Sequence, residues 1–106
     1  MAARRAAIPW LARRDYPSAE LLRKLTEAGY EPDAAQGGIA LLKAERAVDD
    51  ARYAERYVAF HAARGHGPVR IRHDLSALGM ASALYEPALQ AEDWPERAGD
   101  TRRRKF

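Results

Sequence analysis

The feature that most restricts the fold of this chain is an internal repeat. The segment from Glu20 to Gly29 returns in outline as the segment from Arg70 to Gly79, fifty positions later. At this offset the matching pairs are Leu21 and Ile71, Leu25 and Leu75, Ala28 and Leu78, Gly29 and Gly79, Ile39 and Leu89, and Trp10 and Phe60. The matches fall on one apolar face and on a terminating glycine, where a shared packing scheme would place them. The repeat therefore predicts two copies of one helical module.

Composition favours helices and limits the possible chemistry. A chain of 106 residues buries roughly 65% of its unfolded surface, so no deep substrate cavity is expected. Alanine is abundant, whereas valine, isoleucine, threonine and phenylalanine are scarce, which suits helices better than sheets. The absence of cysteine excludes disulfides, thiolate metal sites and cysteine nucleophiles. We therefore expect an all-α protein without redox chemistry, and the tandem modules would make it elongated.

Apolar periodicity, prolines and glycines divide the chain into seven expected helices. Their expected ranges are 3–14, 18–28, 32–44, 50–64, 68–78, a short sixth segment capped by Ser82, and a seventh that Asp93 opens. Gly29 and Gly79 end two of these helices in the left-handed capping position. Three helices per copy predict a first module at residues 1–46, a second at 47–91, and the first helix of an incomplete third module at 92–106.

Two helices contain unfavourable residues. Gly37 and Gly38 lie inside the third expected helix, where each glycine costs roughly 1 kcal/mol, so this helix should be soft. Pro87 lies inside the sixth, where proline removes a hydrogen bond and costs about 3 kcal/mol. We expect a kink or a later helix start there.

The fourth and fifth helices have strong start signals. Val48 and Asp49 have the pattern of a hydrophobic staple and an N-cap, and a capping role is also expected for Asp50. The fourth helix is expected to bury Tyr53, Ala54, Tyr57, Val58 and Phe60. The turn Gly65-His66-Gly67-Pro68 combines a glycine that can take positive φ with a proline suited to the first helical position. We expect Gly65, Gly67 and Pro68 to set the angle between the two helices.

The net charge of +3 is unevenly distributed. From Arg97 onward the chain carries five basic residues and one acid, Asp100, which leaves 13 basic and 14 acidic residues in the rest. The chain therefore lacks the pattern of a uniformly polycationic nucleic-acid binder, and shows local basic surfaces with a basic tail instead.

Several segments, in this order and spacing, resemble the RecX family of recombination regulators. They are Val48–Ala54, Gly65–Leu75, Leu11–Arg14, Glu20–Leu21, Lys24–Leu25 and Asp93–Trp94. The resemblance implies tandem three-helix repeats and a regulator that binds the filament of the RecA recombinase on DNA. Such proteins usually restrain the ATPase and strand-exchange activities of the filament, in DNA recombination, DNA repair and the SOS response, and no catalysis is implied.

Three positions depart from the family pattern. Arg46 stands where the family usually has a glycine before the Asp-Asp element, and Pro17 stands where it often has a serine before the second helix. Pro87 interrupts a helix that is usually unbroken, and most of a third repeat is missing.

Exposed basic residues near the turns are the candidate partner-binding residues: Arg13, Arg14, Arg64, His66, Arg70 and Arg72. Guanidinium groups bind carboxylates and phosphates in bidentate fashion, so these residues could contact an acidic recombinase surface or DNA. The alternative is a solvated face, with intrahelical pairing of Arg70 with Asp74, and of Glu20 with Lys24, each worth about 0.3 kcal/mol. A helical DNA-binding module that acts through phosphates without the recombinase remains the second hypothesis.

The residues expected to have structural roles are Asp49, Asp50, Tyr53, Gly65, Gly67, Pro68 and Trp94. Tyr53, Tyr57 and Trp94 could stack on bases, but their spacing favours core or module-junction positions. His61, His66 and His73 do not have the spacing of a metal site. No nucleophile and base pair, phosphate loop or metal constellation appears, so we expect no enzyme and no cofactor.

The apolar run from Ala6 to Ala12 is too short for a signal-peptide core or a membrane span. We therefore expect a cytoplasmic monomer that does not act at a membrane.

Overall fold

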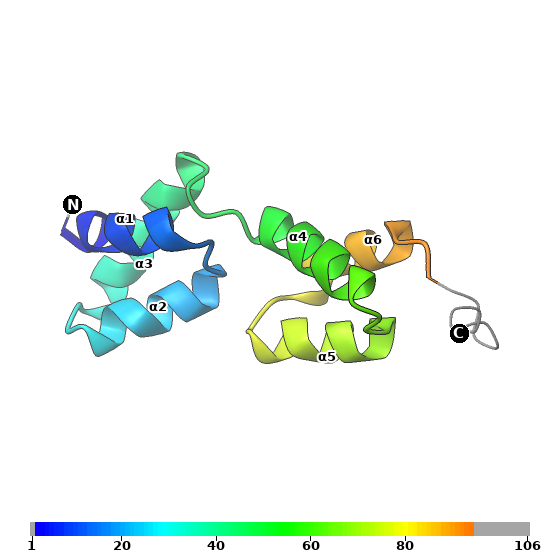
Figure 1. Cartoon of the computed structure of the whole chain (residues 1–106). Helices are drawn as coiled ribbons and strands as arrows, with labels where there is room; N and C mark the ends of the chain where they lie inside the picture. Colours follow the sequence, from blue (N-terminus) through cyan, green and yellow to red (C-terminus); the bar gives the residue numbers. More distant parts are fainter. Residues whose placement is uncertain (1, 95–106) are drawn as a thin grey trace.

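A computed structural model describes residues 2–94, and within this range the protein is all helical (Figure 1). The helices are α1 (Ala2–Arg13), α2 (Ser18–Glu27), α3 (Pro32–Ala44), α4 (Asp50–Ala63), α5 (Pro68–Ala77) and α6 (Ser82–Ala91). The all-α prediction is confirmed. The expected seventh helix lies outside the described residues.

The six helices form two three-helix modules with separate cores. Helices α1, α2 and α3 pack on one another, and α4, α5 and α6 do the same. The first core contains Ala3, Ala7, Tyr16, Leu21, Leu25, Ala35, Ile39, Leu42 and Val48. The second contains Ala54, Val58, Ile71, Leu75, Met80, Tyr85 and Leu89. The modules follow one another along the long axis of the molecule, which is more than twice as long as either other dimension (Figure 1). This arrangement confirms the tandem, elongated fold.

The repeated apolar positions are the centres of the two cores. Leu21 and Leu25 are fully buried in the first module, and their counterparts Ile71 and Leu75 are fully buried in the second. Burial of each such side chain contributes about 1.5–3 kcal/mol. The pairing of Trp10 with Phe60 is different, because Trp10 packs partly buried against the first core whereas Phe60 is 54% exposed. The expected burial of Phe60 was therefore wrong.

Four helices end in the same way. The residue after each C-cap has positive φ, namely 105° at Gly29, 64° at Arg46, 89° at Gly65 and 84° at Gly79. The next N–H then donates to a carbonyl one turn back, as from Tyr30 to Leu25 at 3.1 Å and from Ala47 to Leu42 at 2.9 Å. This is the Schellman arrangement, which favours glycine because a Cβ is strained at positive φ. Arg46 is the one non-glycine residue with positive φ among residues 2–94.

Two further expectations need correction. Ser82 is the first residue of α6 and not its cap, since Ala81 holds the N-cap position without a side-chain hydrogen bond. The helix then continues past Pro87 to Ala91, so the later start expected from Pro87 is wrong.

Gly38 has a packing role that the sequence did not reveal. It is buried inside α3, and a Cβ placed there would lie 3.0 Å from the Cβ of Ala3 and 3.0 Å from the backbone nitrogen of Arg4. The glycine therefore allows α1 to approach the backbone of α3 closely, which offsets its poor helix propensity.

Candidate functional site

The two adjacent acids at the start of α4 cap two different helices. The side chain of Asp49 accepts a hydrogen bond from the backbone N–H of Arg52 at 3.0 Å, so it caps α4 as predicted. Asp50 instead reaches the other module, where it accepts from the backbone N–H of Ser18 at 2.8 Å and from the Ser18 hydroxyl at 2.5 Å. Ser18 is the first residue of α2, and its N-cap residue Pro17 offers no side-chain acceptor. The carboxylate of Asp50 therefore satisfies a free N–H of a helix in the preceding module.

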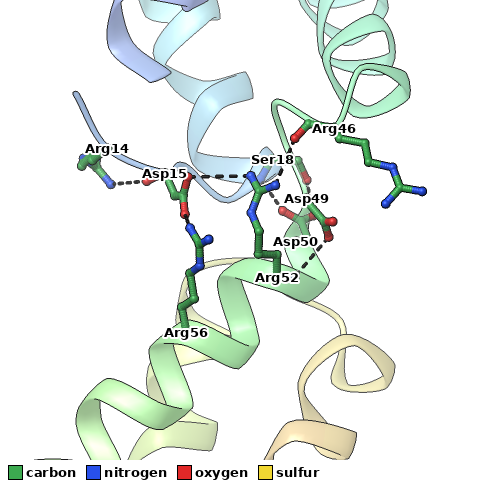
Figure 2. A network of polar contacts seen from close by, with 8 residues as sticks. All are labelled: Arg14, Asp15, Ser18, Arg46, Asp49, Asp50, Arg52 and Arg56. Carbon is green, nitrogen blue, oxygen red and sulfur yellow. Dashed lines mark hydrogen bonds and ion pairs between the residues drawn. The ribbon is translucent and has the colours of Figure 1, made fainter. Parts of the chain in front are cut away.

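A second polar contact between the modules is centred on Asp15. This residue lies in the connection between α1 and α2, and its carboxylate contacts Arg56 at 2.7 Å and Arg52 at 3.7 Å. Arg52 also donates to the backbone carbonyl of Arg46 at 3.0 Å. Figure 2 shows both arginines extending from α4 toward Asp15. Because these contacts surround the Asp50–Ser18 contact, the start of α4 is held against the first module from two directions.

Close backbone packing provides a third contact between the modules. A Cβ on Gly79 would lie 2.8 Å from the Cβ of Ala19 in α2. Gly79 is thus required for two reasons, since it also has positive φ. Its counterpart Gly29 also has positive φ but no atom within 4 Å of such a Cβ.

An open, shallow groove lies beside these contacts between the modules, and we name it the junction groove. It is lined by Arg14 and Asp15 of the α1–α2 connection and by Tyr53, Arg56, Tyr57, Phe60 and His61 of α4. The α4 residues follow a spacing of three and four, which places them on one helical face. Sequence reasoning placed Phe60 in the core and did not predict this groove, because the groove depends on how the modules dock.

Aromatic rings follow this face of α4 in a row. The ring centroids of Tyr53 and Tyr57 are 6.1 Å apart, those of Tyr57 and His61 4.1 Å, and those of His61 and His66 5.0 Å. Tyr53 and Tyr57 also pack against the second core. The expectation that they take core or junction positions agrees with this placement.

Hydrogen bonds fix the far end of the row. The hydroxyl of Tyr57 donates to Asp74 at 3.0 Å; burial and this bond raise the pKa of Tyr57 to about 12. The Nδ1 atoms of His61 and His66 are 3.0 Å apart, which is hydrogen-bond distance when one carries the proton. Burial, and then the proximity of His66, lower the pKa of His61. The pair therefore ties the end of α4 to the glycine-rich turn before α5.

Two of the six candidate partner-binding residues border the junction groove. Arg14 lines it, with its guanidinium 3.8 Å from the centroid of the Tyr16 ring and 2.6 Å from the carboxylate of Glu20. The hydrogen bond to Glu20 raises the pKa of Arg14. The guanidinium of Arg64 lies 4.5 Å from the centroid of the Phe60 ring. Arg14 of the first module and Arg64 of the second thus each contact a part of this groove or a residue that lines it.

His66 contacts the groove residue His61, whereas the remaining three candidates lie apart from that groove. Arg13 is the exposed last residue of α1, and Arg70 is exposed on α5. Arg72 binds Glu86 of α6 through two hydrogen bonds, at 2.6 and 3.1 Å. These bonds raise the pKa of Arg72 and lower that of Glu86. Arg72 therefore already has a structural partner, whereas Arg70 has no ion pair among residues 2–94.

The intrahelical pairs expected from the sequence do not form. Asp74 accepts from Tyr57 and not from Arg70, while Glu20 binds Arg14. Lys24 donates to the hydroxyl of Tyr16 at 3.0 Å, and this bond lowers the pKa of Tyr16. Partners from other parts of the fold thus replace the pairs along one helix. The contacts of Tyr57 with Asp74 and of Lys24 with Tyr16 are partly buried, so water screens them less.

Structural roles are also evident for the remaining motif residues. Gly67 is the N-cap residue of α5 and Pro68 its first residue, as the sequence indicated. The indole N–H of Trp94 donates to the carbonyl of Leu89 at 2.9 Å, and the ring packs partly buried against the second core. Within residues 2–94 no three histidine and carboxylate side chains come together as metal ligands. None of the six helices is long and apolar enough to cross a membrane.

Fold and surface together define a class of protein: a tandem array of small helical modules, joined by polar contacts, with arginine and aromatic side chains at the junction. Comparison with known proteins gives the family. Residues 3–37 match the first three-helix domain of RecX, and residues 49–89 match the second three-helix domain of RecX. The chain belongs to the RecX family.

Individual relatives support this assignment over the whole chain. A "Regulatory protein RecX" of Pseudomonas fluorescens is 40% identical over 108 residues, which cover 100% of this chain and 70% of the relative. The protein of that name from Ectopseudomonas mendocina (strain ymp) is 39% identical over 108 residues, 100% of this chain and 72% of the relative. The one from Stenotrophomonas maltophilia (strain K279a) is 40% identical over 102 residues, 94% of this chain and 63% of the relative.

Proposed function

We propose that this protein is a non-enzymatic regulator of homologous recombination that binds the filament of the RecA recombinase on DNA and restrains its ATPase and strand-exchange activities. The observation that carries this proposal is the match to both RecX three-helix domains, in order, with about 40% identity to proteins named as RecX regulators. The proposed partner places the protein in the cytoplasm.

The docking of the modules supports binding to a polymeric partner. A filament offers the same surface at regular intervals, so a binder with two binding regions gains affinity when the distance between them is fixed. Here the contacts at Asp15, Asp50 and Gly79 join the two modules and so restrict that distance. We propose partner binding for Arg13, Arg14, Arg64, His66, Arg70 and Arg72, of which Arg72 is already paired with Glu86.

The test measures ATP hydrolysis by a RecA recombinase on single-stranded DNA, with and without this protein. We expect slower hydrolysis as the protein is added, and co-sedimentation of the protein with the filament. Unchanged hydrolysis at saturating protein, together with no sedimentation, would refute the function.

Variants can separate partner binding from folding. Substitution of Arg64 and Arg70 with alanine should weaken the inhibition while the helical circular dichroism stays unchanged. Arg23→Ala, on the exposed face of α2, is the matched control and should inhibit like the wild type. Arg72→Ala should be compared with the separate variant Glu86→Ala, because either change breaks the same ion pair. If Arg72→Ala weakens filament binding more than Glu86→Ala does, Arg72 contacts the partner.

Direct phosphate binding is the second candidate, and exposed arginines on both modules favour it. It predicts that the protein binds single-stranded DNA without recombinase, with a log-log salt dependence of about −0.7 per neutralised phosphate. Binding to the recombinase filament that exceeds binding to naked DNA at the same salt concentration would reject this candidate.

A further inference from the structure

The junction groove combines an exposed aromatic residue with arginines from both modules. Phe60 is 54% exposed, and it lies on the face of α4 that lines the groove. Its ring meets His61 edge-on, with centroids 5.1 Å apart and planes at 84°. A single exposed apolar side chain is common on protein surfaces. Aromatic residues and arginine are enriched in the cores of protein interfaces, so an exposed phenylalanine beside arginines in a groove has the composition of a protein-binding site.

Arg56 and Arg64, which lie beside Phe60, have N–H donors available for a ligand. The guanidinium of Arg64 lies over the ring and has no ion pair among the described residues. The side chain of Arg56 is 67% exposed and binds Asp15 through one nitrogen. A guanidinium carries five N–H donors in a planar fork, so both groups can bind further carboxylates. The groove therefore complements a negatively charged ligand with an apolar group.

Ring geometry favours a protein segment over nucleic-acid bases. Base stacking requires a free aromatic face. The ring of Tyr57 lies between those of Tyr53 and His61 in the row on α4, and Arg64 covers the ring of Phe60. A base would have to displace these neighbours from the ring faces that they occupy, whereas a small aliphatic or aromatic side chain can pack against the exposed part of Phe60 while carboxylates bind the arginines.

We propose that the junction groove binds an acidic segment of a protein partner, with an apolar side chain against Phe60 and adjacent carboxylates on Arg56 and Arg64. This inference rests on the proposed function, since it names the kind of recombinase feature that the groove would recognise. Because residues of both modules line the groove, binding depends on their docking.

The test uses the full chain and a short fluorescein-labelled peptide of aspartate and glutamate residues with one central phenylalanine. Fluorescence anisotropy should show saturable binding. Replacing the peptide phenylalanine with alanine should weaken binding about tenfold. Phe60→Ala in the protein should weaken it by a similar factor, whereas Val69→Ala, which removes a 77% exposed apolar side chain outside the groove, should leave it unchanged.

Three outcomes would overturn the inference: equal binding of both peptides, wild-type binding by Phe60→Ala, or displacement of the peptide by oligothymidine at lower concentration than by unlabelled peptide. The last would assign the groove to nucleic acid.

Filament sedimentation with the same variants separates this inference from the function. If wild type and Phe60→Ala sediment equally with the filament, the groove assignment fails and the function stands. If wild type does not sediment but binds the peptide, the function fails and the groove remains a site for acidic peptides.

Discussion

The carboxylate of Asp50 binds both the backbone N–H and the hydroxyl of Ser18, which lie in the other module. A helix N-terminus is thus capped from a position 32 residues further along the chain. We predict that Asp50→Ala destabilises the protein by about 1–2 kcal/mol, since it removes a cap and leaves the N–H of Ser18 without its acceptor. Urea unfolding followed by circular dichroism measures this loss. Glu55→Ala, at an exposed position of α4, is the control and should change stability by less than about 0.5 kcal/mol.

Arg46 occupies a backbone conformation that suits glycine. Its φ of 64° corresponds to the positive φ of Gly29, Gly65 and Gly79 at the equivalent cap positions, and its side chain extends away from the contacts around Asp15 (Figure 2). We predict that Arg46→Gly raises the unfolding free energy by about 0.5–1 kcal/mol, because relief of the left-handed strain exceeds the entropy that glycine loses on folding. Urea unfolding should show a higher midpoint. Arg23→Gly, inside α2, should have the opposite sign; a fall in stability for both variants would contradict the explanation.

Gly79 and Gly29 allow backbone strain to be separated from contact between the modules. Both have positive φ, but only at Gly79 would an added Cβ meet a neighbour, Ala19, at 2.8 Å. Gly29→Ala should cost about 1 kcal/mol for the strain alone, and Gly79→Ala about 1–3 kcal/mol more for overpacking. Thermal unfolding of the two variants gives the difference. Equal losses would mean that the modules separate readily at this contact.

The ion pair of Arg72 with Glu86 predicts a pH effect. The hydrogen bond from Arg72 lowers the pKa of Glu86 below its ordinary value. The stabilisation is therefore present above the ordinary pKa of glutamate, about 4.3, and is lost as the pH falls through the lower folded value. Carbon-detected NMR titration of the Glu86 carboxyl should show a lowered midpoint, and Arg72→Ala should return it toward the ordinary value. An unchanged midpoint in the variant would show that the pair does not persist in solution.

Much of the helical frame could be predicted from the sequence because its determinants are local. Gly29, Gly65 and Gly79 mark helix ends by a property of their own backbone, and Asp49 caps the helix that directly follows it. The repeat of Leu21 as Ile71 indicated equivalent cores without any knowledge of the angle between the modules.

Contacts between the modules could not be predicted in the same way. Asp49 and Asp50 are adjacent and chemically identical, yet the helix directs one carboxylate to its own first turn and the other to Ser18. Likewise, the exposure of Phe60 depends on how α4 docks on the first module, which no local pattern records. The pairing of Tyr57 with Asp74 also joins two helices, and it takes the acid that Arg70 was expected to bind.

Because Asp50 of the second module caps α2 of the first, the two modules are expected to evolve together. Excision of either module, or its exchange for a homologous copy, loses this contact unless the new neighbour supplies a matching acceptor or donor. Substitutions at Ser18 and Asp50 should therefore arise together. In chimaeras that join modules from different homologues without this pair, α2 should unfold first at its N-terminus.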